Sequence, residues 1–260
     1  VKAKNTGNKP YPLTLWLHSI PAMSTPKSDD IYLPGLANVA EVGKIQVINL
    51  DHNKLVKVGK TEKKNCFVAP SSPWSARISH SSPLMFAYLL NKNDLMPKGI
   101  FYTWSGKKDN DFIQTQEVIL NPVTIKPGDT HEWKYKIALF GGMFGISDII
   151  NGYAINYRYK MEQDTLRIKF KVCCAEFQEA QWLQIKIRDI NDPGNGPTFG
   201  EARIMLPIMQ PNKPVTVVAD LKKMKEGTFR MFAEIARKGF HVVPGPIIKI
   251  KKIIRFEPEK

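Results

Sequence analysis

The sequence predicts an all-β protein built from two β-sandwich domains in series. Apolar side chains alternate with polar ones along many short stretches, which is the period of a half-buried strand. Clusters of Pro, Gly, Asn, Asp and Ser separate these stretches, as turns between strands do. After Gly145 the alternation becomes cleaner, with roughly seven short strands in about 110 residues, which is typical of an immunoglobulin-like sandwich. We therefore expect one domain over residues 1–143 and a second over 149–258, joined near Gly141–Gly145.

The first expected strand, 13–18, places Trp16 and His18 together on one face, because side chains alternate along a strand. The stretch 23–43 is rich in Ser, Pro, Asp and Gly and is expected to be a loop. Further strands of the first domain are expected at 45–50, 55–58, 74–78, 84–90 and 100–104.

The stretch 112–140 is the one around which the first domain is expected to be organised. Pro127-Gly128-Asp129 predicts a tight turn, because proline presets φ and glycine accepts a positive φ. Strand-like alternation precedes and follows this turn. We expect a hairpin that presents one carboxylate, Glu117, at the end of its first strand.

The second domain is predicted from clean alternation between strong turn signals, such as the Asn-, Asp-, Pro- and Gly-rich stretch 191–197. It contains no carboxylate pair or phosphate-binding loop, so we expect a packing or binding module. Its expected strands are 153–160, 165–174, 182–188, 202–206, 215–221, 227–236 and 247–256.

Composition excludes several classes of protein. The net charge of +14 arises largely from lysines at single alternating positions, as on the solvent side of strands, and no nucleic-acid-binding signature is present. A weak attraction to anionic glycans or to an acidic cell surface fits this charge equally well. No stretch reaches the roughly 20 apolar residues of a membrane span. The three cysteines form neither a disulfide framework nor a metal pattern, so we expect no metal or other cofactor.

Two motifs carry a family resemblance. The stretch NTGNKPYPLTLWLHSI near the start resembles a strand of galactose mutarotase-like domains that ends in a catalytic histidine. The glutamate-bearing strand followed by IKPGDTHEWKYKI resembles the late signature of the same family. The resemblance implies a β-supersandwich over roughly the first 140 residues. In the family the histidine lies well inside the domain, so its position at residue 18 predicts that the first strands precede Val1.

The resemblance implies that His18 is the acid and Glu117 the base of an aldose epimerase-like site. The aromatic residues that follow the family's histidine are replaced here by Ser19-Ile20-Pro21, and the glutamate of its turn is Asp129. We therefore expect a weak sugar-binding protein with little or no mutarotation.

Three further residues are candidate sugar-binding groups: Trp74, Arg77 and Trp104. Aromatic rings stack on the apolar faces of pyranoses, and arginine donates a fork of hydrogen bonds. The competing interpretation is that the tryptophans belong to the core.

The sequence therefore supports three functions, in this order. The first is a carbohydrate-binding or carbohydrate-processing protein that uses one face of the first sandwich. The second is an epimerase-like enzyme, and the third is a structural or adhesion module of a cell envelope. A periplasmic or extracellular location suits all three.

Overall fold

The computed structural model describes residues 1–20, 29–38, 55–59, 64–79, 81–108, 111–150, 152–189, 198–224, 227–235 and 243–250. In these ranges the chain is almost entirely strand, and strands β1 to β22 are accompanied by one short helix, α1 (Lys92–Leu95). The prediction of an all-β sandwich protein is confirmed. The expected strand 45–50 and the turn 191–197 lie outside the described residues.

The chain divides into two compact units between Leu139 and Phe140, inside strand β14 (Tyr135–Gly141). Each unit has an apolar core of its own. The first core is built from buried residues between Leu17 and Trp133, and the second from residues between Ile150 and Ile235. The division lies slightly before the predicted junction.

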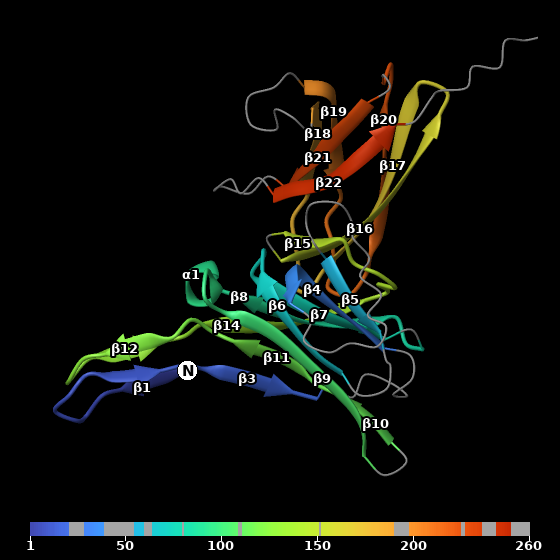
Figure 1. The fold of residues 1–260 in the computed structure, drawn as a ribbon. Helices are drawn as coiled ribbons and strands as arrows, with labels where there is room; N and C mark the ends of the chain where they lie inside the picture. Colours follow the sequence, from blue (N-terminus) through green and yellow to red (C-terminus); the bar gives the residue numbers. More distant parts are fainter. Residues whose placement is uncertain are drawn as a thin grey trace, which may run out of the picture. The chain divides into compact units, whose positions relative to one another are not determined.

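The main sheet of the first unit has the strand order β14-β8-β7-β4-β6-β9-β11-β3, with β5 beside β4 and β10 beside β9 (Figure 1). Its strands other than β14 are β3 (Trp16–Ser19), β4 (Asp29–Asn38), β5 (Leu55–Gly59), β6 (Lys64–Pro70), β7 (Trp74–Ser79), β8 (Leu84–Leu90), β9 (Ile100–Lys108), β10 (Asp111–Gln114) and β11 (Gln116–Ile119).

Strand β4 corrects the expectation of a loop for residues 29–38, and the rest of the stretch 23–43 lies outside the described residues. Its first half pairs with β5 and β7, and its second half, from Gly35, pairs with β6. Pro34, which has no N–H to donate, lies where the pairing partners change. Pro34 and Gly35, two of the residues that gave the stretch a loop-like composition, thus lie where β4 passes from one part of the sheet to the other.

The predicted hairpin around Glu117 is wrong in its pairing. The turn itself exists, with Gly128 at φ 82° and the Asp129 N–H donating to the Lys126 carbonyl at 3.0 Å. However, β11 and β14 lie far apart in the strand order. The turn joins β12 (Val123–Ile125) to β13 (Thr130–Glu132), which pair with β2 (Tyr11–Leu13) and β1 (Lys2–Lys4), respectively. Figure 1 shows β1 and β12 on the arm that these four strands form.

The second unit contains two four-stranded antiparallel sheets, ordered β15-β16-β17-β20 and β19-β18-β21-β22. Alternate side chains of both sheets meet in one core, which includes Ile168 and Phe170 from one sheet and Ile185 from the other. The strands are β15 (Asp148–Ile150), β16 (Tyr153–Glu162), β17 (Thr165–Cys174), β18 (Gln181–Asp189), β19 (Thr198–Leu206), β20 (Val215–Leu221), β21 (Gly227–Ile235) and β22 (Val243–Ile250).

The strands of the second unit follow the sequence prediction closely. The expected 165–174 and 215–221 coincide with β17 and β20. Strand β22 begins before the expected 247–256, and residues 251–256 lie outside the described part. Agreement is close here because each strand buries one face against the opposite sheet, so its alternation is regular.

Candidate functional site

Two adjacent rows of side chains cross the strands β3, β11, β9 and β6. Directly paired residues project to the same side of a sheet, and their neighbours along each strand project to the other. One row, Leu17, Val118, Phe101 and Val68, is buried in the core of the first unit. The next row, His18, Glu117, Tyr102 and Phe67, therefore lies on the opposite side of the sheet.

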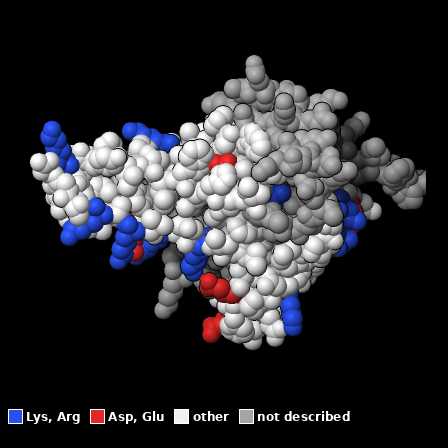
Figure 2. All heavy atoms as spheres, turned by 90° about the horizontal axis from the view of Figure 1, so that it is seen from below, with Lys and Arg blue, Asp and Glu red and all other residues white. Residues whose placement is uncertain are grey.

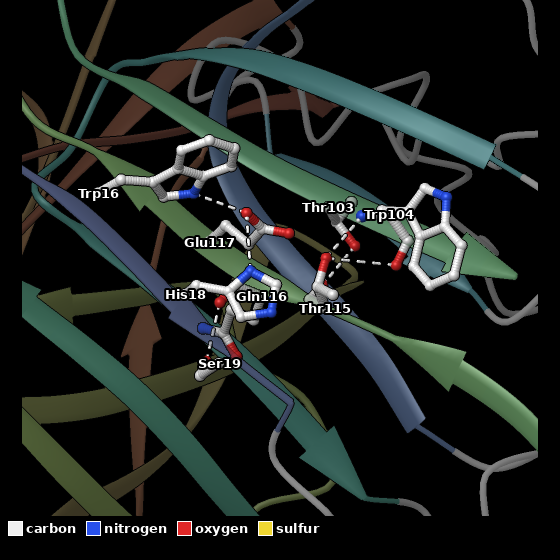
Figure 3. A network of polar contacts seen from close by, with 8 residues as sticks. All are labelled: Trp16, His18, Ser19, Thr103, Trp104, Thr115, Gln116 and Glu117. Carbon is white, nitrogen blue, oxygen red and sulfur yellow. Dashed lines mark hydrogen bonds and ion pairs between the residues drawn. The ribbon is translucent and has the colours of Figure 1, made fainter.

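Glu117 is the centre of a polar contact network on this side. Its Oε2 atom accepts a hydrogen bond from the Trp16 indole Nε1 at 2.6 Å and lies 3.2 Å from His18 Nδ1 (Figure 3). The Glu117 side chain is only 2% exposed, whereas that of His18 is 54% exposed. Trp16 is also more than half exposed. The buried carboxylate thus contacts two exposed side chains.

The local sequence explains how these groups meet. Trp16 and His18 flank Leu17, which is buried, so both must project away from the core. The register then sets His18 opposite Glu117 and Trp16 opposite Ile119. A carboxylate near two ring N–H groups is the arrangement that satisfies a buried acid.

Tyr102 extends the row toward Phe67. Their rings stack with centroids 4.6 Å apart and an interplanar angle of 25°. Burial raises the pKa of the Tyr102 phenol above its ordinary value, and the negative charge of Glu117 adds to the effect. The phenol therefore remains protonated at neutral pH and can donate a hydrogen bond.

Trp104 lies two residues beyond Tyr102 on β9, on the same side, and is 38% exposed. Its backbone N–H donates to Thr115 Oγ1 at 2.9 Å, and Thr103 Oγ1 donates to the Thr115 carbonyl at 2.7 Å (Figure 3). Thr115 is the residue between β10 and β11, where the strand is interrupted. These hydrogen bonds hold the interruption against β9. We refer to Trp16, His18, Phe67, Tyr102, Trp104 and Glu117 as the aromatic face.

Two of the predicted sugar-binding residues lie elsewhere. Trp74 and Arg77 are 2% and 3% exposed and, being three positions apart on β7, point to opposite sides of the sheet. The Arg77 guanidinium donates to the Gln114 carbonyl at 2.8 Å inside the unit. All six residues of β7 are buried, so the structure does not bring Trp74 or Arg77 to the aromatic face.

The aromatic face contains residues that were not among the sequence candidates. Trp16 and His18 share the i, i+2 spacing that Tyr102 and Trp104 repeat, and this repeated pair is a signal available in the sequence. Phe67 carries no such signal. It joins the others only through the pairing of β6 with β9.

Comparison with known proteins does not add an identity. A scan against models of protein families and a search of curated proteins both found no match to this chain. Among the described residues, no cluster of His, Cys, Asp and Glu could hold a metal ion. No helix in the described ranges has the length and apolar character needed to cross a membrane.

Basic side chains are numerous around the first unit. Figure 2 shows lysines and arginines scattered singly over the visible face, with few acidic side chains between them. This distribution agrees with lysines on the solvent side of strands. It gives the surface a general attraction for anions without forming a compact patch in this view.

Proposed function

We propose that the chain binds a carbohydrate on the aromatic face of its first unit. The observation that carries this proposal is the set of exposed rings, Trp16 and Trp104 above all, arranged around a buried carboxylate that fixes Trp16 and His18. The C–H faces of a pyranose stack on such rings. The hydroxyls of the sugar need partners nearby that both donate and accept hydrogen bonds.

His18 lies where it can supply such a partner. His18 Nδ1 lies 3.2 Å from Glu117 Oε2, so Nε2, the other ring nitrogen, remains available to a sugar hydroxyl. The Tyr102 ring, which stacks on Phe67, adds aromatic surface in the same row of side chains. Fixed rings and fixed polar atoms bind with a small loss of side-chain entropy, which favours recognition by a preformed surface.

Binding is favoured over catalysis by the burial of Glu117. An epimerase-like mechanism needs the acid and the base on either side of the reacting sugar atoms, each within hydrogen-bond reach. Here the carboxylate is 2% exposed, and its Oε2 contacts His18 and Trp16 instead. We assign Glu117 a positioning role. The close approach of His18 and Glu117 keeps an aldose epimerase-like activity as the second candidate.

Tryptophan fluorescence measures the binding directly. Titration with neutral and acidic sugars should change the emission of the unmodified protein, and Trp16→Ala or Trp104→Ala should abolish the change. Trp182→Ala is the matched control, because it removes a partly exposed tryptophan from the second unit. Glu117→Gln keeps the shape but loses the charge, and should weaken binding by roughly three- to tenfold, as expected for one charge-assisted hydrogen bond.

Polarimetry separates the binding protein from the enzyme. Freshly dissolved glucose or galactose should mutarotate at the same rate with and without the protein. An acceleration that Glu117→Gln removes would establish the epimerase-like function instead. If no sugar alters fluorescence or mutarotation, the proposal fails and the structural or adhesion module becomes the better account.

A further inference from the structure

A second candidate site lies wholly within the second unit, apart from the aromatic face. A pocket of about 290 Å³ is lined by Phe144, Asn156, Arg158, Lys169, Lys171 and Thr216. Most of these residues lie on β16, β17 and β20, at positions that alternate with core residues such as Ile155, Ile168 and Phe170. The pocket is therefore on the outer side of this sheet, away from the core.

Strand register concentrates positive charge in the pocket. Arg158 is paired with Lys169 across β16 and β17, and Lys171 lies two residues further along β17 on the same side. Like charges placed directly opposite each other on a sheet are unfavourable. In the described part of the chain, no carboxylate forms an ion pair with these three side chains.

At the other end of the same side of this sheet, the basic side chains form ion pairs with carboxylates. Arg167 donates to both carboxylate oxygens of Asp220, at 2.8 and 3.0 Å, and also pairs with Glu162 at 2.8 Å. Lys160 pairs with Glu162 as well. Within the described residues, the basic side chains at this end of the sheet are thus paired with carboxylates, whereas Arg158, Lys169 and Lys171 are not.

Neutral groups complete the pocket. Phe144 is 57% exposed, and Lys171 Nζ lies 5.3 Å from the centroid of its ring. Asn156 Oδ1 accepts a hydrogen bond from Ser147 Oγ at 3.3 Å, which leaves its Nδ2 group as a donor for a ligand. Thr216 adds a hydroxyl opposite Lys171. Cations, an exposed ring and amide and hydroxyl groups are thus gathered within the space of one small ligand.

We infer that this pocket binds one anionic sugar unit, bearing a carboxylate or a sulfate, of a polyanionic glycan. The guanidinium and ammonium groups would bind the anion by charge-assisted hydrogen bonds. The Phe144 ring would stack on the sugar, and Asn156 and Thr216 would bind hydroxyls. The volume suits a single ring, since small-ligand pockets begin at about 300 Å³. This inference does not depend on the function proposed for the aromatic face.

Isothermal titration of the full chain tests the inference. The probes are a sulfated oligosaccharide, an oligogalacturonate, a neutral oligosaccharide of equal length, inorganic sulfate and oligothymidylate. Arg158→Gln/Lys169→Gln is compared with Lys160→Gln/Lys222→Gln, which removes the same charge outside the pocket. The pocket variant should bind the anionic oligosaccharides about five- to tenfold more weakly, as expected for two exposed charge pairs. The control variant should change binding by less than about twofold.

Phe144→Ala distinguishes a sugar from a simple anion. It should weaken binding of the anionic oligosaccharides about threefold or more through lost stacking, and leave inorganic sulfate unaffected. Comparing the sulfated with the carboxylated oligosaccharide identifies the anionic group. Equal weakening in the pocket and control variants would overturn the inference, because attraction would then follow net charge alone. Tighter binding of oligothymidylate than of every saccharide would also overturn it.

Discussion

Glu117 and Arg77 are two buried charges of the first unit that use their surroundings differently. Glu117 contacts Trp16 and His18, which are both exposed. The buried carboxylate therefore holds two surface rings in place. Arg77 binds the Gln114 carbonyl inside the unit. The first arrangement can serve recognition, while the second stabilises the interior, since a buried charge without such partners is costly.

The three cysteines are all free and buried, as core thiols. Burial raises the pKa of the Cys66 and Cys173 thiols from the usual value near 9 to about 11. Above pH 9 the unfolded chain ionises these thiols while the folded chain does not. The free energy of unfolding should therefore fall as pH rises from about 9 toward 11, by on the order of 1 kcal/mol per thiol at pH 10.

Urea unfolding at pH 7.5 and at pH 10 measures this thiol effect. Cys66→Ala/Cys173→Ala is the comparison, because it removes the thiol contribution and leaves the buried tyrosines, which also resist ionisation. The double variant should lose less stability than the unmodified chain between the two pH values. Equal losses would show that the thiols ionise as readily in the folded state as in the unfolded chain.

At the scale of elements, the arm of the first unit depends on the turn at Gly128. The Gly128 N–H donates to the Asn5 carbonyl at 2.8 Å, and the Asn5 N–H donates to the Asp129 carbonyl at 3.0 Å. These bonds connect the turn between β12 and β13 to Asn5, which directly follows β1. The turn therefore sets the register of β13 on β1 and of β12 on β2.

Gly128→Ala should destabilise the first unit by about 1 kcal/mol, because an alanine at positive φ is strained. No atom lies within 4 Å of the added Cβ, so the cost is that of the backbone conformation alone. Gly152→Ala is the matched control, since Gly152 has the same φ of 82° and the same open surroundings in the second unit. Chemical denaturation can be followed by the NMR signals of each unit. Gly128→Ala should lower the unfolding midpoint of the first unit alone, and Gly152→Ala that of the second unit alone. A shift of both units by either variant would contradict independent unfolding.

At the scale of the whole molecule, the two cores are built from separate parts of the chain. Gly141 belongs to the second unit through its neighbours: its N–H donates to Asn212 Oδ1 at 2.9 Å, and its carbonyl accepts a bond from Cys173 Sγ at 3.4 Å. Met143 and Ile146 are buried as well. The stretch expected to join the two domains thus contains structural residues of the second unit.

A C-terminal piece beginning at Phe140 should therefore fold alone, and should be more stable than a piece beginning at Ile149. The shorter piece lacks Met143 and Ile146, and losing buried side chains of this size costs roughly 2–5 kcal/mol each. Circular dichroism and thermal unfolding of both purified pieces check this order. An unfolded longer piece would contradict the division into two independently folding units.

The sequence by itself determined the all-β class, most strands of the second unit and the strand face shared by Trp16 and His18. These features rest on alternation between neighbouring residues, which is a local property of the chain. The tertiary structure decided which strands pair, and therefore that β11 lies beside β3 and β9 rather than in a hairpin with β14. It also decided that Trp104 is exposed and Trp74 buried, although both are strand tryptophans. Pairing and covering join residues far apart in the chain, and no local pattern specifies which segment covers a given strand face.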